Sequence, residues 1–352
     1  MNYMRSVNFS IIIAVYNASL TIKQAVESVL QQTYTNFEII LINDGSQDNS
    51  GDICCELGRM DNRIRYIEFP CNLGLSHVRN HGILSAQGEY LGFLDADDIL
   101  ELNALAVCAD NLKNKPADIL VCGFFEEYRT TNKKEPFRLC KLPGHGFYSS
   151  PDDISDAVLE MIRSSSFCYT WNKLYKRRFL IEQGITFQKY PYIEDILMNL
   201  EAFARCSSVI LMNVPLYHYN RGVQFSLTTR FEPNFLRLHQ YLMDKEVTYF
   251  SAANHLKQAM SVLTCQYLKL VFTALQMTFY KGAPAGIMKV LLMETFQYPH
   301  HKLFMSFVHQ LPLKYQLLGL ILNFHSPKII RGVSYCIYVA KHKLIRLWCA
   351  VK

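Results

Sequence analysis

Acidic residues are missing from the last part of this sequence. Residues 301–352 contain eight lysines and arginines and no aspartate or glutamate, whereas the whole chain carries 36 basic and 30 acidic residues. The positive charge is therefore a property of the C-terminal region, and without a nucleic-acid motif we expect no nucleic-acid partner. Basic segments interleaved with apolar runs suit the anionic surface of a membrane. The plainer alternative is a helical subdomain with solvated lysines.

Long apolar runs are missing as well. No stretch reaches the roughly 18 uncharged apolar residues of a spanning helix. The nearest, residues 261–280, is interrupted by Lys269. The apolar run near the N-terminus is too short for a signal peptide and is better explained by a first strand. The eleven cysteines form no C-x-x-C pair, which favours reduced thiols in a cytoplasmic protein over a disulfide framework.

The first 125 residues alternate short apolar runs with amphipathic stretches. Ile22, Ala25, Val26 and Val29 recur at helical spacing after a candidate N-cap at Ser19. Predicted strands cover residues 9–15, 37–43, 64–69, 89–95 and 117–124, with helices at 19–32, 48–60, 75–87 and 101–112. This alternation predicts an α/β fold with a mostly parallel sheet flanked by helices. From about residue 151 the pattern becomes mainly helical, and we place two domains at 1–225 and 226–352.

Polar clusters follow two of the predicted strands. Asp95, Asp97 and Asp98 end the fourth, and Asp44 and Gly45 follow the second. In such sheets ligands lie at the C-terminal ends of the strands, so both clusters should share one edge. Clustered carboxylates suit a hard divalent ion, Mg²⁺ or Mn²⁺, that shares a substrate diphosphate. The alternative is that Asp98 caps the following helix while the other two are solvated.

Four stretches, in this order, resemble family 2 glycosyltransferases with the GT-A fold. They are "SIIIAVYNASLTIKQAVESVLQQTYTNFEIILINDGSQDNS", "NLGLSHVRNHGILSAQGEYLGFLDADD", "YTWNKLYKRRFL" and "YIEDILMNL". The resemblance implies a metal-dependent enzyme that moves a sugar, with inversion, from a UDP-sugar to a hydroxyl of a growing surface glycan. Lipopolysaccharide, capsule and exopolysaccharide are the expected products. The acceptor would be a glycan or lipid-linked glycan, handled at the inner face of a bacterial cytoplasmic membrane.

The resemblance also assigns roles to residues. Asp97 resembles the metal ligand, and Asp195 the base that takes the proton of the acceptor hydroxyl, with Glu194 as its support. Helix N-terminal charge is the competing explanation for this acidic pair. The residues matched to nucleotide-sugar contacts are Ala14, Tyr16, Asn17, Asp44, Gly45, Arg79 and Asp95.

A further group could contact donor or acceptor. Trp171 offers a flat face to a sugar, or else anchors a helix to the core, and Asn172 and Lys173 can donate hydrogen bonds. His218 could bind a metal, although a lone histidine is more often structural. Arg221, or alternatively Arg230, could close over the diphosphate.

Two other functions compete with sugar transfer. A nucleotidyltransferase would carry a glycine- and lysine-rich loop after the first strand, and "AVYNASLT" has none. A non-catalytic nucleotide-binding or assembly subunit at the membrane would lack the aspartate cluster or the acidic base, and both are present in the sequence.

Overall fold

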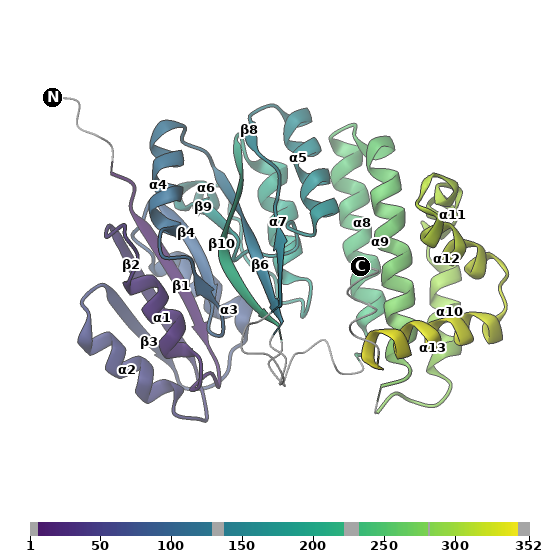
Figure 1. Cartoon of the computed structure of the whole chain (residues 1–352), viewed down its shortest axis with the longest axis horizontal. Helices are drawn as coiled ribbons and strands as arrows, with labels where there is room; N and C mark the ends of the chain where they lie inside the picture. Colours follow the sequence, from purple (N-terminus) through teal and green to yellow (C-terminus); the bar gives the residue numbers. More distant parts are fainter. Residues whose placement is uncertain (1–5, 129–136, 222–231, 281, 344–352) are drawn as a thin grey trace. The chain divides into compact units, whose positions relative to one another are not determined.

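The computed structural model describes residues 6–128, 137–221, 232–280 and 282–343. The chain forms two compact units, Met1–Val223 and Gln224–Lys352. The first unit is built around a sheet, and the second consists of helices (Figure 1). The α/β fold followed by a helical region is therefore confirmed.

The first half of unit 1 alternates strands and helices as the sequence predicts. Its strands lie side by side and parallel in the order β3-β2-β1-β4. The elements are β1 (Phe9–Val15), α1 (Ile22–Leu30), β2 (Phe37–Asp44), α2 (Ser50–Met60), β3 (Ile64–Phe69), α3 (Leu75–Ser85) and β4 (Tyr90–Asp95).

Helix α1 shows both the strength and the limit of the periodicity argument. Ile22, Ala25, Val26 and Val29 are all buried, so the predicted face is confirmed. The N-cap at Ser19 is wrong, because the helix begins at Ile22. The Ser19 amide instead donates to Asp48 Oδ2 at 3.1 Å, which ties this loop to the one after β2.

The second half of unit 1 extends the same sheet. The order continues from β4 through β9, β6 and β10 to β5, with β7 on β6 and β8 on β10. The elements are β5 (Ile99–Leu100), α4 (Ala104–Asn114), β6 (Ile119–Tyr128), β7 (Phe137–Lys141), β8 (Gly146–Tyr148), α5 (Pro151–Ser164), β9 (Lys173–Lys176), α6 (Arg177–Glu182), α7 (Glu194–Arg205) and β10 (Val209–Arg221).

Two of these strands correct the expectation of a mainly helical chain after residue 151. β9 is antiparallel to both β4 and β6 and joins them, so the segment containing Trp171 leads into a strand rather than a helix. β10 is parallel to β6 and lies next to β5. The residues after Asp98 form β5, so Asp98 does not cap a helix.

Unit 2 is organised around one long helix, α9 (Leu256–Met277), whose buried residues include Tyr267 and Phe272. α9 packs against α8 (Phe235–Ala252), α10 (Ile287–Gln297), α11 (His301–Ser306), the 3₁₀ turn η2 (Val308–Gln310), α12 (Leu313–Asn323) and α13 (Pro327–Lys343). Among the described residues, no helix has both the length and the apolar character needed to cross a membrane.

Candidate active site

Residues 95–98, which we call the aspartate turn, lie at the end of β4 and are tied to β10 by Asp98. Its side chain is 1% exposed and accepts hydrogen bonds from the Tyr217 hydroxyl at 2.7 Å and from the Asn220 amide at 2.8 Å. Burial, together with the charges of Asp95 and Asp97, raises the pKa of Asp98 well above its usual range. Asp98 therefore fixes the turn to β10 and is not available to a ligand.

Asp97 is the carboxylate of this turn that is left for a ligand. Within the described chain, no other residue bonds to its side chain. Burial and the neighbouring charge of Asp95 raise the pKa of Asp97 to about 6. A carboxylate held in this way gains stability from a cation.

The donor set at this turn fits a divalent ion that is shared with a substrate. No group of three histidine, cysteine or acidic side chains among the described residues forms a complete metal site. Hard ions such as Mg²⁺ are commonly held by one or two carboxylates, with substrate phosphates and water completing the shell. Asp97, assisted by the oxygen of Asp95 that does not bond to Arg79, matches that design.

Arg79 joins two acidic residues that are far apart in the sequence. It lies on α3, is 3% exposed, and pairs through Nη2 with Asp95 Oδ1 at 2.9 Å and through Nη1 with Asp195 Oδ1. Although burial opposes it, the charges of Asp195 and Asp95 raise the pKa of Arg79. The guanidinium also lies 5.2 Å from the Phe187 ring centroid and 5.8 Å from that of Phe93. These contacts bring α3, the end of β4 and the start of α7 together.

Asp195 and Glu194 begin α7, as predicted, but have different surroundings. Oδ2 of Asp195 accepts hydrogen bonds from the Thr170 amide at 3.3 Å and the Thr170 hydroxyl at 3.1 Å. The Asp195 side chain stays 19% exposed, so solvent or a substrate can reach it. Burial raises the pKa of Glu194, and its Oε2 is buried without a partner in the described chain.

The loops after β1 and β2 meet at the same end of the sheet. The Asn17 amide donates to Ser46 Oγ at 3.0 Å, and Asn17 Oδ1 accepts from the Gln47 amide at 2.8 Å. Tyr16 is 47% exposed and follows β1, whose residue Ala14 pairs with Asp95 of β4. The structure thus places the predicted nucleotide-contact residues beside the aspartate turn.

Asp44 and Gly45 shape this edge from within. Asp44 is buried and accepts from the amides of Leu73 at 2.8 Å and Gly74 at 3.0 Å, so it orders the loop that leads into α3. Gly45 has φ +64°, and an added Cβ would lie 2.5 Å from the carbonyl carbon of Cys71. Only glycine fits this close approach of two loops.

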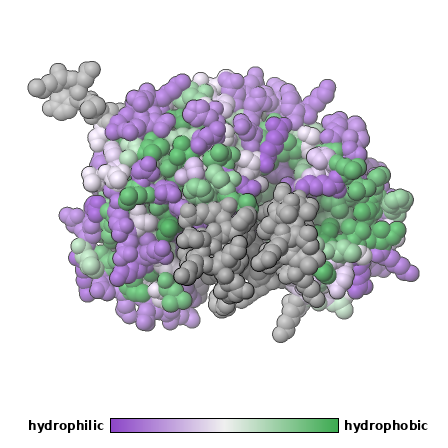
Figure 2. All heavy atoms as spheres, in the orientation of Figure 1, coloured by the Kyte–Doolittle hydropathy of each residue, from purple (hydrophilic) through white to green (hydrophobic). Residues whose placement is uncertain are grey.

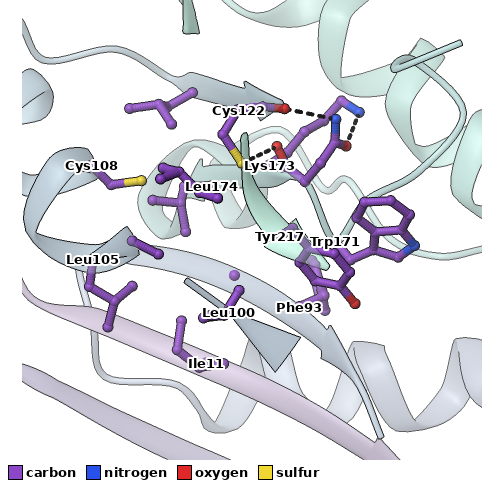
Figure 3. Close-up of a pocket in the computed structure, with 15 residues that line it drawn as sticks. Ile11, Phe93, Leu100, Leu105, Cys108, Cys122, Trp171, Lys173, Leu174 and Tyr217 are labelled. Carbon is purple, nitrogen blue, oxygen red and sulfur yellow. Dashed lines mark hydrogen bonds between the residues drawn. The ribbon is translucent and has the colours of Figure 1, made fainter. Parts of the chain in front are cut away.

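Of the five predicted contact residues on this part of the chain, Trp171, Asn172, Lys173 and His218 are buried, whereas the Arg221 side chain stays 34% exposed. Trp171 stacks on Tyr217 and Tyr169 at centroid distances of 4.2 and 4.4 Å and is 5% exposed, so it offers no free face to a sugar. Figure 3 shows its ring beside that of Tyr217. Asn172 and Lys173 are fully enclosed and bond to main-chain carbonyls.

The other two lie further along β10. His218 Nδ1 contacts Glu127 at 2.6 Å, and its Nε2 contacts Glu101 at 2.8 Å. Both ring nitrogens are therefore occupied, which corrects the idea of a metal ligand. Arg221 pairs with the buried Glu126 at 3.1 Å. Arg230, the alternative residue for closing over the diphosphate, lies outside the described residues.

A small cavity in the interior of unit 1 is lined by residues that include Trp171 and Tyr217 (Figure 3). Its volume is about 40 Å³ and its lining is mainly apolar. Ligand pockets are usually at least about 300 Å³, so this cavity is a packing defect rather than the donor site.

Sequence reasoning missed Thr170, Tyr217 and Asn220. Each acts on an aspartate that lies 25 to 122 positions away in the chain. Hydroxyl and amide side chains are common at every surface, so residue type alone gave no signal.

Comparison with known proteins identifies the family. The model of glycosyl transferase family 2 matches residues 10–184, which include β1, the aspartate turn and β9. The chain belongs to glycosyl transferase family 2. Among its relatives, glycosyltransferase GlyA of Streptococcus pneumoniae is 34% identical over 215 residues, 60% of this chain but 30% of GlyA.

Solved structures share the fold. S. aureus TarS, crystallised with UDP-GlcNAc, superposes with a TM-score of 0.58 at 18% identity, over 96% of this chain and 92% of that one. The mannosyltransferase PcManGT of Pyrobaculum calidifontis, in complex with GDP-Man and Mn²⁺, gives a TM-score of 0.51 at 14% identity, over 91% and 88%. The family 2 chain therefore has the GT-A fold.

Proposed function

We propose that this protein is an inverting, metal-dependent glycosyltransferase. It moves a sugar from a UDP-sugar to a hydroxyl of a growing surface glycan, such as lipopolysaccharide, capsule or exopolysaccharide. The observation that carries the proposal is the Arg79 bridge, which holds Asp95 of the donor edge and Asp195 at the start of α7 on one guanidinium. Asp95, a carboxylate on the donor side, and Asp195, the base on the acceptor side, then border one reaction centre.

In the proposed reaction, Asp195 accepts the proton of the acceptor hydroxyl while that oxygen bonds to the anomeric carbon. The bond from the anomeric carbon to the diphosphate oxygen breaks, and its electron pair leaves with the nucleotide diphosphate. Attack from the face opposite the leaving group inverts the centre. Asp97 would hold Mn²⁺ or Mg²⁺, which when bound neutralises charge on the leaving diphosphate. Arg79 keeps the ionised base oriented through Nη1.

The choice of donor and metal draws support from fold relatives. TarS is crystallised with UDP-GlcNAc and PcManGT with GDP-Man and Mn²⁺. Tyr16 and Asn17 would border the uracil, and Gly45 lets the main chain approach the nucleotide closely.

Peripheral binding to the inner face of a bacterial cytoplasmic membrane is the second part of the proposal. Helix α12 exposes an apolar stripe, and Figure 2 shows hydrophobic residues gathered over the helices of unit 2. The stripe consists of Leu313, Leu317, Leu320 and Phe324, each at least 51% exposed. Exposed Lys314, Lys328 and Arg331 accompany it, and no acidic residue follows Glu294. Apolar and cationic groups together match an anionic bilayer that presents a lipid-linked acceptor.

A nucleotide panel tests the enzymatic part. Thermal unfolding is followed with UDP, GDP, CDP and ADP, each with and without Mn²⁺, in wild type and Asp97→Ala. A ligand at 100 times its Kd adds about 2.7 kcal/mol to the free energy of unfolding. We expect stabilisation with UDP and Mn²⁺ together, lost in Asp97→Ala. If no nucleotide stabilises wild type, the proposal fails and the assembly-subunit alternative gains.

Vesicle flotation tests the membrane part. Wild type should float with vesicles that contain phosphatidylglycerol and not with pure phosphatidylcholine. Replacing Leu317 and Leu320 with glutamate should abolish flotation without changing nucleotide binding. Self-association of wild type that the double variant removes, with no flotation, would assign the stripe to a second copy of the chain instead.

A further inference from the structure

Lys173 is a buried cation whose hydrogen-bond acceptors are all neutral. It lies on β9, is 2% exposed, and its Nζ donates to the carbonyls of Ser166 at 3.0 Å, Phe167 at 3.2 Å and Tyr169, and to Asn172 Oδ1 at 2.9 Å. Within the described residues no acidic side chain pairs with it. Burying an unpaired charge is costly, so a residue of this kind indicates a specific structural task.

That task is to hold residues 166–170, which we call the cradle loop. The loop links α5 to β9 and has no regular structure. Asn172 Nδ2 donates to the Ser166 carbonyl at 3.1 Å, and Asn199 Nδ2 donates to the carbonyls of Phe167 at 2.7 Å and Tyr169 at 3.1 Å. Side chains from β9 and α7 thus satisfy carbonyls that would otherwise be buried without partners. Figure 3 shows Lys173 beside Cys122.

The cradle loop ends at Thr170, which bonds to the proposed base. With its carbonyls held from inside, the loop presents the Thr170 amide and hydroxyl to Oδ2 of Asp195, at 3.3 and 3.1 Å. The other carboxylate oxygen, Oδ1, is held by Arg79. The orientation of Asp195 therefore depends on the loop as much as on the arginine.

We infer that Lys173 is a positioning residue that fixes the cradle loop and, through Thr170, sets the orientation of the Asp195 carboxylate. The inference rests on the proposed function, in which Asp195 is the base. It also revises the role of Lys173 and Asn172, which the sequence suggested as direct contacts of donor or acceptor. Burial lowers the pKa of Lys173 to about 7, because the charged form loses its hydration inside the protein.

The test separates positioning from simple stabilisation. Variants Lys173→Met, Thr170→Val and Thr170→Ser are compared with Lys176→Met, a control on the same strand. Side chains alternate along a strand, so Lys176 points to the face of the sheet opposite Lys173. UDP release is measured with UDP-GlcNAc, UDP-glucose and UDP-galactose as donors and a bacterial envelope glycolipid extract as acceptor.

A positioning role predicts a split between kcat and KM. Lys173→Met should lower kcat by about 10- to 100-fold, because a misplacement of about 1 Å can cost about 100-fold, which is less than the loss expected when the base itself is removed. KM for the donor and Kd for UDP should stay within about twofold of the wild-type values, since neither Lys173 nor Thr170 is among the residues proposed to contact the nucleotide. Thr170→Val should lower kcat about tenfold and Thr170→Ser should restore it, while Lys176→Met has no effect.

The outcomes are distinguishable from failure of the proposed function. If Asp195→Asn keeps its kcat, the base assignment and this inference both fail. If Asp195→Asn loses activity but Thr170→Val and Lys173→Met keep theirs, only this inference is overturned. Should Lys173→Met not fold, the Thr170 pair decides alone, because a hydroxyl deletion leaves the carbonyl contacts of the loop intact.

Discussion

Replacing Asp97 with asparagine should make the ligand-free protein more stable and the enzyme inactive. In the folded chain burial and the charge of Asp95 raise the pKa of Asp97 from 3.8 to about 6. The folded state then binds this proton more tightly than the unfolded state, so stability is greatest in acid and is lost as pH rises from about 4 to 6. Asparagine keeps the shape and removes the charge.

The gain in stability expected for Asp97→Asn follows from the raised pKa of Asp97. A difference of about 2.2 pKa units corresponds to about 3 kcal/mol at pH 8, and allowing for the partial exposure of Asp97 we expect about 2 kcal/mol. For a unit of this size that is a rise in Tm of about 4–8 °C. At pH 5 the ionisation is partial, and the advantage of asparagine should fall to about half.

The sequence provides a suitable probe. It contains two tryptophans, and Trp171 lies in unit 1, where it stacks on Tyr217, whose hydroxyl donates to Asp98 of the aspartate turn. In a Trp348→Phe background, Trp171 fluorescence reports unfolding of unit 1 by heat or urea, without metal or nucleotide. Asp110→Asn, on the exposed side of α4, is the matched control and should change stability by less than about 0.5 kcal/mol.

The result that refutes the reasoning is equally definite. If Asp97→Asn is no more stable than wild type at pH 8, the turn stores no repulsion and needs no cation. If it is more stable but keeps its response to UDP and Mn²⁺, the repulsion exists but Asp97 does not hold the metal.

Three further predictions concern the framework around the site and the second unit. Gly45→Ala should destabilise unit 1 by more than about 3 kcal/mol in urea unfolding, because the added Cβ would lie 2.5 Å from Cys71 and φ is +64°. A decrease in the free energy of unfolding of less than about 1 kcal/mol would contradict the steric argument. Burial raises the pKa of Glu246 from 4.5 to about 7, so the stability of unit 2 should fall as pH rises between these values. In thermal melts Glu246→Gln should therefore stabilise unit 2 by about 3 kcal/mol at pH 8 and by almost nothing at pH 4. Equal stabilisation at both pH values would argue against a buried charge. Tyr217→Phe should cost about 1.5–3 kcal/mol by removing a donor to a buried carboxylate of the turn, and wild-type stability of this variant would show that the hydroxyl is not needed there.

Local pattern determined the first half of unit 1. Buried β-branched runs and amphipathic stretches alternate regularly, so strand and helix could be assigned, and parallel strands place their C-terminal ends on one edge. That geometry alone predicted that Asp44 and the aspartate turn would be neighbours. The N-cap prediction at Ser19 was wrong because residues 19–21 belong to the loop: the Ser19 amide donates to a distant side chain, Asp48, and the helix begins only at Ile22.

The later strands could not be predicted in the same way. β9 has four residues and β5 has two, too few to show a period. They are strands because open sheet edges of β4, β6 and β10 lie beside them and supply the hydrogen bonds. Tertiary pairing decided their structure.

The sequence by itself determined the family, the α/β fold class and the acidic groups of the site, because strand periodicity and the order of motifs are local properties of the chain. Only the tertiary structure decided what each group does. Arg79 meets Asp195 across 116 positions, and Lys173 is buried and bonds to carbonyls of the cradle loop instead of facing a sugar. The reason is physical: a charged side chain can serve a ligand or the interior, and burial, which depends on the whole fold, selects between them.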